Sequence, residues 1–514
     1  MHITPMESIK RYGNVIIFIC VIIEMLIWPS INNLFGCLMT IISWFIFSRI
    51  GLNKQVAKEH IFAWLVFVSM SLYRILPLIA TMLEGHSIGY NFILPLSTYC
   101  GETLLYLISA LAFYLAINCK NPLSFLKKIL FQCGFYDRAN KTTLWMMGIL
   151  GFILQIYTTV NYIEYGNVIG KTLIGFTFFQ YAPILLFFPN LMGNNNSNKI
   201  IVINKACVFY IALLVISSFA TNSREVMLEP IGTFAILFLL SYINTSHNIS
   251  HVINSKYIII VILAVSFVIP IINNISLAML YNRQFRKDTN RAELFVKTIE
   301  TLSDKKKMEE LHFLKEKRDM NEQNNTTSKT WSETYLRNFV FNRYCNLKVA
   351  DNTLYHAKKV GFANKQMFDD FWLEIAALMP TPVLKFLNID YDKNVRYSRG
   401  DKLKAMSTNK HPFSSKLITS HLADGLLTFG YWYFPIEFLL FFVRFLFMDT
   451  FLLRYKGKIY YSVFGLICIF SFLALARHGG GCCDSLKYLI RGYWQDVILF
   501  IIGFTLLKKV SLKF

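Results

Sequence analysis

Two histidines stand in a polar stretch that leads directly into an aromatic, apolar run. The stretch HPFSSKLITSHLADGLLTFGYWYFPIEF contains His411 and His421. A neutral imidazole is a general base whose pKa lies near physiological pH, so it can take a proton from an attacking hydroxyl. Asp424 and Gly425 suit the start of a predicted membrane helix at 425–447, which places His421 at the mouth of that helix. A structural or surface role is commoner for a single histidine, and it stays the alternative.

Two arginines precede predicted membrane helices in a similar way. Arg224 lies in the short polar connection TNSRE, and Arg491 lies a few residues before the last apolar run. A guanidinium at the membrane surface can make bidentate, charge-assisted bonds to phosphate. The alternative is that each side chain anchors its helix at the interface, or that Arg224 pairs with its neighbour Glu225. We take both arginines as candidates for stabilising an anionic leaving group.

Three further arginines lie in polar or glycine-rich loops. Arg396 and Arg399 stand close together in DYDKNVRYSRGDK, where they could bracket an anionic group, and Arg477 precedes three consecutive glycines. Together with His411, these three are candidate substrate-binding residues. A solvated loop is the commoner fate of such a charge cluster, and it remains open for each of them.

The composition indicates a membrane protein with many spans. Of 514 residues, 54% are hydrophobic and only 16% are charged, and the mean hydropathy is +0.43. A soluble chain of this length would carry nearer a quarter charged residues. The formal net charge of +21 fits an excess of Lys and Arg in cytoplasmic loops. We see no folded basic module, so we expect no nucleic-acid partner.

Apolar runs long enough to cross a bilayer predict about twelve membrane helices in an all-α fold. The predicted spans are 14–29, 32–49, 61–83, 98–117, 143–162, 172–192, 203–220, 226–243, 257–279, 425–447, 459–476 and 494–508.

The distribution of Lys and Arg among the short loops predicts that both termini are cytoplasmic. Residues 1–280 would then hold spans one to nine, and 425–514 would hold spans ten to twelve. Between them, 281–424 forms a large insert on the outer face. Its apolar residues recur at helical spacing, so we expect a small, mostly helical external domain.

Several kinds of chemistry have no matching motif in the chain. There is no P-loop, no H-E-x-x-H pattern and no metal-binding Cys/His spacing, and the adjacent Cys482 and Cys483 suit neither a disulfide nor a zinc site. We therefore expect no metal and no cofactor. The chain also lacks symmetric Gly- or Pro-broken spans, which weakens a secondary-transporter interpretation.

The candidate residues gather on the predicted outer face, where no nucleotide is available. Chemistry there needs a substrate that is already activated and already in the membrane. A polyprenyl-diphosphate glycan has these properties, because its diphosphate sits at headgroup level and its sugar projects outward. Arginines would neutralise charge on the leaving diphosphate, and a histidine would deprotonate an acceptor hydroxyl.

The layout and three local patterns resemble the Wzy-type O-antigen polymerases of bacterial inner membranes. These patterns are TNSRE at 221–225, SHLADGLLTFG at 420–430, and Arg491 near the last span. Many members carry a second glycine three residues after the first, where this chain has Tyr433. The related O-antigen ligases have a similar His, Leu, Gly arrangement, in which the histidine is thought to be the base.

The resemblance implies an enzyme of lipopolysaccharide or other surface-polysaccharide biosynthesis in the inner membrane. It would be a lipid-diphosphate-dependent glycosyltransferase that joins undecaprenyl-diphosphate-linked repeat units with inversion. His421, Arg224 and Arg491 would carry the reaction. Its partners would be the lipid-linked donor and acceptor glycans, membrane lipid and a chain-length regulator. Three alternatives stay open: an O-antigen ligase, which transfers glycan to lipid A core; a lipid-linked oligosaccharide flippase or other transporter; and a structural or sensor membrane protein whose outer domain is a binding module.

Overall fold

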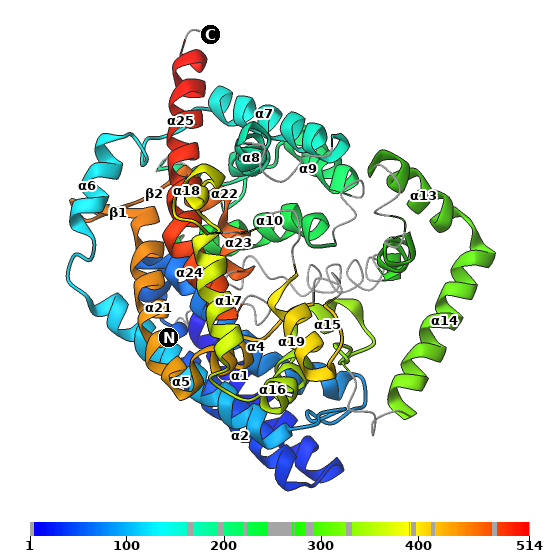
Figure 1. The fold of residues 1–514 in the computed structure, drawn as a ribbon. Coiled ribbons are helices and arrows are strands. Elements are labelled where there is room, and N and C mark those ends of the chain that lie inside the picture. Colours follow the sequence, from blue (N-terminus) through cyan, green and yellow to red (C-terminus); the bar gives the residue numbers. More distant parts are fainter. Residues whose placement is uncertain are drawn as a thin grey trace.

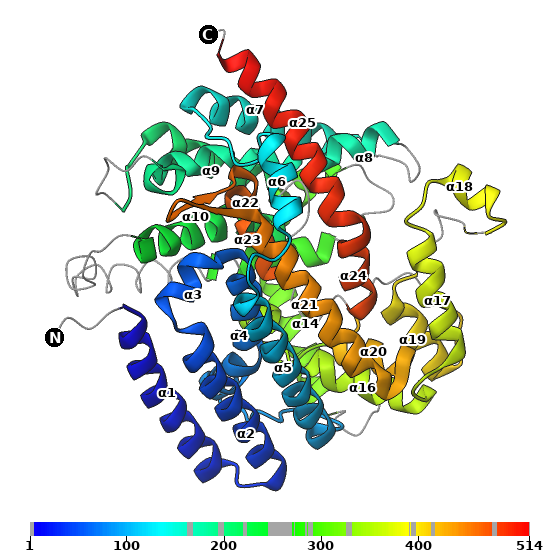
Figure 2. The ribbon, with the colours of Figure 1, turned by 90° about the vertical axis from the view of Figure 1, so that its left-hand side faces the viewer.

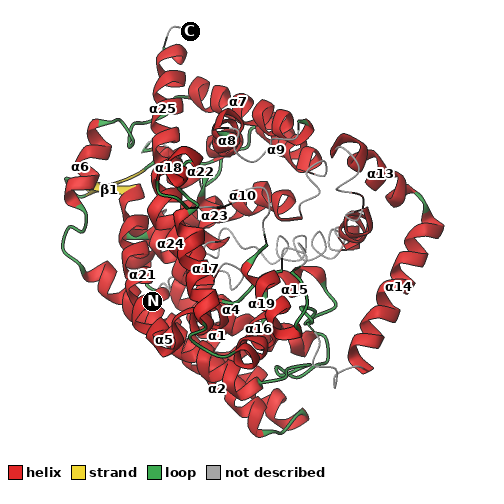
Figure 3. Ribbon diagram, viewed as in Figure 1, coloured by secondary structure: helices red, strands yellow, loops and turns green. Residues whose placement is uncertain are grey.

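The computed structural model describes residues 5–161, 168–193, 200–218, 224–244, 270–271, 273–282, 285, 291–324, 331–389, 391, 397–412, 417–474 and 481–512. Within these ranges the chain is mostly helical, and two short antiparallel strands pair at one edge of the molecule (Figure 3). The prediction of an all-α polytopic membrane protein is therefore confirmed at this coarse level.

The elements fall into three groups along the chain. The first group is α1 (Pro5–Ile27), α2 (Ile31–Ile46), η1 (Phe47–Gly51), α3 (Lys54–Glu59), α4 (Ile61–Leu83), α5 (Pro95–Asn118), α6 (Ser124–Gln132), α7 (Lys141–Val160), α8 (Val168–Gly175), η2 (Thr177–Phe187), η3 (Pro189–Met192), α9 (Lys205–Ser218) and α10 (Arg224–Asn244). The second group is α13 (Arg291–Ser303), α14 (Lys305–Asn324), α15 (Phe339–Tyr344), α16 (Lys348–Val360), α17 (Lys365–Ala376), α18 (Thr381–Phe386) and α19 (Arg399–Thr408). The third group is α20 (His421–Phe429), η6 (Gly430–Trp432), α21 (Tyr433–Met448), η7 (Asp449–Phe451), β1 (Leu452–Tyr455), β2 (Lys458–Tyr461), α22 (Val463–Ile467), α23 (Ile469–Ala474), α24 (Gly481–Lys487), η8 (Tyr488–Gly492) and α25 (Tyr493–Ser511).

Helix α4 is the central helix of a bundle formed with α2, α5 and α21 (Figure 2). Within its apolar window, 83% of the residues are buried inside the protein, which is typical of a helix surrounded by other helices. Aromatic rings join the three helices: Phe67 stacks on Phe113 with ring centroids 4.4 Å apart, and Phe113 meets Phe445 edge-on at 5.1 Å. This packing fixes α4, α5 and α21 relative to one another.

Helices α16, α17 and α19 belong to the predicted insert and pack against α20 or against each other. Helices α13 and α14 belong to the same insert, and they lie at the edge of the molecule away from that packing (Figure 1). The insert is helical where it is described, as the sequence predicted. Its location outside the membrane stays a prediction.

Eight described helices are long and apolar enough to cross a membrane. They are Ile31–Gly51, Ile61–Leu83, Pro95–Asn118, Lys141–Val160, Ile169–Phe187, Val226–Asn244, His421–Phe451 and Gly481–Ser511. Each overlaps one predicted span, and Lys205–Ser218 is a shorter apolar helix at a further one.

The remaining predicted spans have three different outcomes. The first, 14–29, lies mostly in α1, which carries Glu7, Lys10, Arg11 and Glu24 and is not among the eight. The ninth, 257–279, lies largely outside the described residues. The eleventh, 459–476, differs from the prediction, because its described part begins in β2 and continues as the two short helices α22 and α23.

Candidate functional site

His421 is the first residue of α20 and lies in the interior of the protein. Ser420 caps this helix, because its Oγ accepts a hydrogen bond from the Ala423 amide at 3.1 Å. The same hydroxyl shares a 2.9 Å hydrogen bond with Thr353 on α16. The imidazole side chain is only 7% exposed. A cap that is itself bonded to a second helix holds the histidine at a fixed place.

The chain reverses direction between α20 and α21, which corrects the predicted single helix at 425–447. Gly430 has φ +57° and ψ −143°, a conformation that residues with a side chain rarely adopt. After this turn α21 packs back against α20. Gly425 makes the close approach possible, since a Cβ there would lie 2.0 Å from the ring of Tyr433.

The reversal brings Glu437 of α21 beside His421. The Glu437 side chain is completely buried, and its Oε1 lies 3.3 Å from Nδ1 of His421. Neither carboxylate oxygen of Glu437 and neither ring nitrogen of His421 has a hydrogen-bond partner among the described residues. Ionisable groups at membrane depth are costly to bury, so a pair left this open is a candidate for function.

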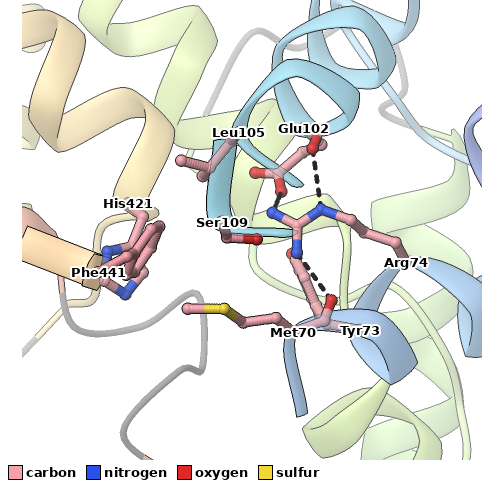
Figure 4. Close-up of a pocket in the computed structure, with 8 residues that line it drawn as sticks. All are labelled: Met70, Tyr73, Arg74, Glu102, Leu105, Ser109, His421 and Phe441. Atoms are coloured by element: carbon pink, nitrogen blue, oxygen red, sulfur yellow. Dashed lines mark hydrogen bonds and ion pairs between the residues drawn. The ribbon is translucent and has the colours of Figure 1, made fainter. Parts of the chain in front are cut away.

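A small cavity opens beside this pair, between α4, α5, α20 and α21 (Figure 4). Its volume is about 10 Å³, which is room for about one water molecule. His421 and Phe441 form one side, and Leu105 and Ser109 lie between them and the opposite wall. Met70 and Tyr73 complete the lining with the charged pair described next.

The opposite wall of the cavity is an ion pair between Arg74 of α4 and Glu102 of α5 (Figure 4). Arg74 donates from Nη2 to Oε2 of Glu102 at 2.6 Å and from Nε to the Glu102 carbonyl at 2.9 Å. Its Nη1 donates to the Met70 carbonyl at 2.8 Å. The cavity therefore has a satisfied ion pair on one side and an incompletely bonded histidine on the other.

Sequence reasoning missed two of these acidic residues. Arg74 was recognisable as a charge inside a predicted span, but Glu102 and Glu437 were not selected. Each is the first acidic residue inside a long apolar run, and that position was the available signal. Their pairing with Arg74 and His421 depends on helix packing, which the sequence does not display.

Arg399 lies in a buried network that joins α19 to α17 and α20. Its Nε bonds to Asp424, its Nη2 donates to the Thr428 hydroxyl at 2.6 Å, and its Nη1 lies 3.2 Å from Asp370. Burial opposes the charge of this guanidinium, but Asp424 holds the pKa of Arg399 above its usual value. The side chain that we predicted to bind substrate is thus occupied by protein partners in this structure.

The Arg399 network continues to α24 through Glu374. This carboxylate pairs with Lys487 and lies 3.5 Å from Lys402. Burial alone would raise the pKa of Glu374. The charges of Lys487, Lys402 and Arg399 outweigh burial and hold this pKa below its usual value. Cys482 and Cys483 are buried beside these carboxylates. The network binds the insert to the first turns of the last membrane helix.

Arg491 is exposed and lies just before α25. Its Nη1 donates to the carbonyl of Leu378 at 3.0 Å, and its Nε donates to Gln495 at 3.1 Å. These bonds use two of its nitrogens and leave the side chain accessible to a ligand. His411 is also exposed, and it is not among the residues that line the cavity with His421.

Three predicted site residues cannot be placed. Arg224 begins α10, but its side chain lies outside the described part of the structure, and Arg396 and Arg477 lie outside the described residues altogether. Among the described residues, no group of three or more His, Cys, Asp or Glu side chains is arranged to hold a metal ion.

Comparisons with known proteins add no relative, since no protein-family model, curated protein or solved structure matches the chain. The candidate site must therefore be judged on its own geometry.

Proposed function

We propose that this protein polymerises polyprenyl-diphosphate-linked oligosaccharide units at the outer face of a bacterial inner membrane. The observation that supports this most directly is His421, a buried imidazole that borders a cavity within a helical membrane bundle. A histidine held against a carboxylate, with its other nitrogen open, has the arrangement of a general base. The resemblance of the sequence to Wzy-type polymerases supplies the substrate class.

In this reaction the acceptor sugar hydroxyl attacks the anomeric carbon of the donor glycan. The bond between that carbon and the donor diphosphate breaks, and the lipid diphosphate leaves with the electron pair. Nε2 of His421 takes the proton of the attacking hydroxyl. Glu437, beside Nδ1, favours the tautomer that leaves Nε2 free and offsets the positive charge of the imidazolium. Attack opposite the leaving group inverts the anomeric centre.

The leaving diphosphate needs cations at headgroup level. Arg491 supports this role because it is exposed and keeps nitrogen donors available beyond its bonds to Leu378 and Gln495. Arg224 is proposed for the same role on the basis of its sequence position. Arg399 is less suited to it, since Asp424, Asp370 and Thr428 already surround its guanidinium.

A deletion strain analysed by lipopolysaccharide gel tests the proposal. Loss of the ladder, with one repeat unit left on the core, indicates a polymerase. Loss of all surface glycan, with accumulation of lipid-linked polymer, indicates a ligase. We expect the polymerase pattern, and we expect His421→Ala, Arg224→Ala and Arg491→Ala to fail to restore the ladder.

Matched variants separate loss of chemistry from loss of protein. His411→Ala changes an exposed histidine and should have a milder effect on the ladder than His421→Ala, and the amount of each variant in the membrane fraction should equal that of the parent. A normal ladder from His421→Ala would remove the general base from this site. Normal chain length in both arginine variants would overturn their role in leaving-group stabilisation.

A transporter of lipid-linked oligosaccharide is the second candidate, and one observation favours it. Several charged residues lie buried in the described apolar helices, among them Glu24, Arg74, Glu102, Glu437 and Arg444. Charges inside membrane helices often mark a substrate or ion pathway. In the same deletion strain, a flippase predicts lipid-linked single units that accumulate on the cytoplasmic side.

A further inference from the structure

A segment of the insert that begins at the end of α17 exposes an unusual amount of apolar surface. The segment extends from Ile375 to Ile389, contains α18, and has no acidic residue and a single basic one, Lys385. Phe386 is 86% exposed, and Val383 and Leu387 are 40% and 46% exposed. A segment in water would be expected to cover such residues or to surround them with charges.

The exposed apolar surface continues onto α17. Phe368 and Trp372 lie one turn apart on its outer face, 39% and 49% exposed, with ring centroids 6.3 Å apart. Phe371 is buried and packs on Phe429 of α20 at 5.0 Å, and Phe368 also lies against that ring at 5.8 Å. Phe368 and Trp372 therefore pack partly on the protein and leave part of each ring exposed.

The start of this segment lies beside the residues just before α25, where the exposed apolar surface of the last membrane helix begins. Arg491 donates to the carbonyl of Leu378, which fixes the end of α17 beside η8. From this point α25 exposes Ile498, Ile502 and Leu506 along its length, as a lipid-facing helix does. Figure 2 shows α17 and α18 on the same side of the molecule as α25, with α18 projecting away from the bundle.

We propose that residues 379–389 dock into the interfacial layer of the lipid bilayer. The apolar side chains of α18 would lie among the upper acyl chains, and Lys385 would extend to the anionic headgroups. Trp372 has the amphipathic ring that is enriched at this depth. The insert is then anchored to the membrane through this segment, and the anchor keeps Arg491 at headgroup level. This inference concerns lipid contact and holds whether or not the protein is a polymerase.

A fluorescent label placed on the full-length protein in lipid nanodiscs tests this inference. The label is attached to Phe386→Cys in a chain whose exposed cysteines Cys100, Cys119 and Cys133 are replaced by Ser. Leu506→Cys on α25 serves as the lipid-facing control, and Lys359→Cys on α16 as the water-facing control. Both control side chains are exposed, as Phe386 is.

We expect the label at 386 to show blue-shifted emission and strong quenching by nitroxide groups attached near the lipid headgroups. The label at 506 should also be quenched by lipid nitroxides, and the label at 359 should not. Emission at 386 that matches the label at 359 would overturn the proposal. Quenching that depends on two labelled chains sharing one nanodisc would instead indicate a second copy as the occupant, and would overturn it as well.

A charge substitution provides a second measurement. Phe386→Glu, introduced into a chain labelled at Val383→Cys, places a carboxylate in the proposed acyl-chain layer. The label at 383 should then lose its quenching by lipid nitroxides, because burying the carboxylate is unfavourable. Unchanged quenching would contradict insertion of the segment.

Discussion

His421 and Glu437 belong to different helices, yet Nδ1 of one lies 3.3 Å from Oε1 of the other. If the chain between them were one straight helix, they would be roughly 24 Å apart along its axis. The turn at Gly430 removes this distance by folding α20 against α21. Proximity of the two side chains is thus a product of one local break in a membrane helix.

Removal of the Glu437 charge should reduce activity without removing the protein. We expect Glu437→Gln to lower the rate on the order of tenfold or more, because the amide no longer favours one tautomer or balances an imidazolium. His421→Ala should lower it by roughly 10²–10⁴, the usual contribution of a general base. Rates can be measured as lipid-linked polymer formed by purified protein in vesicles.

The double variant shows whether the two residues act together. If Glu437 acts only through His421, then adding Glu437→Gln to His421→Ala should lower the rate of polymer formation almost no further. Two losses that multiply would show that Glu437 acts independently of the histidine, and would contradict the positioning role.

The turn at Gly430 should be needed for activity beyond its effect on stability. Gly430→Ala places a side chain where φ is +57°, 3.2 Å from Cβ of Ala363, at a cost of roughly 1–3 kcal/mol. Relief of this strain would open the turn and separate His421 from Glu437. We expect a lower melting temperature in detergent together with loss of polymer formation.

Gly457 offers a matched control for this substitution. It has φ +72° in the turn between β1 and β2, and a Cβ there would meet nothing within 4 Å. Gly457→Ala should therefore lower the melting temperature by a similar or smaller amount and leave activity intact. Equal losses of activity in both variants would attribute the effect to stability alone.

Much of the helical framework was predictable because apolar runs long enough to cross a bilayer are conspicuous in a sequence. The run at 61–83 coincides with α4, and seven other runs overlap candidate spans. The break at Gly430 was not predicted, since a single glycine in an apolar run is compatible with a continuous helix. A two-stranded hairpin before α22 was also missed, because Arg454, Lys456 and Lys458 indicated a polar loop and most of the second strand fell in the predicted span 459–476.

The candidate site was predictable only in part. His421 was selected because a titratable side chain beside an apolar run is unusual, and the structure places it at a cavity. Its neighbours Glu437, Arg74 and Glu102 come from three different helices, and their convergence is a matter of tertiary packing. For Arg399 the prediction and the structure differ. A pair of arginines in a polar loop predicts anion binding, but the sequence does not show that Arg399 is buried against Asp424.

Mild acid should destabilise the insert through His356. This imidazole is 1% exposed, bonds to the Ser407 hydroxyl at 2.8 Å and stacks on Trp331. Burial, together with Lys359 and Lys404, lowers the pKa of His356 to about 4 from its ordinary 6.5. Between these values the unfolded chain binds the proton and the folded chain does not, so stability falls as the pH falls from about 6.5 to about 4.

Hydrogen exchange of α16 at pH 7 and pH 5 measures this effect. Exchange is compared as protection factors, which divide out the slower intrinsic exchange at pH 5. We expect lower protection at pH 5 than at pH 7 in the parent protein and a smaller difference in His356→Gln, which cannot titrate. His411→Gln changes an exposed histidine and should keep the parental difference. The same loss of protection in His356→Gln as in the parent would assign the acid sensitivity to another group.

We expect Arg399 to stabilise the folded protein rather than to bind substrate. Removing one partner of a buried ion pair leaves the other charge uncompensated, at a cost of roughly 3–5 kcal/mol, and Arg399→Ala would leave Asp424 in that position. We therefore expect less protein in the membrane and a lower melting temperature. Arg399→Lys keeps the charge but cannot bond to three partners at once, so its melting temperature should lie between those of the parent and Arg399→Ala.

The neighbouring Lys402 is more exposed and provides a control. Lys402→Ala should lower the melting temperature less than Arg399→Ala does. Arg399→Ala protein with parental stability and no polymer formation would contradict this structural role and would restore the guanidinium as a substrate ligand.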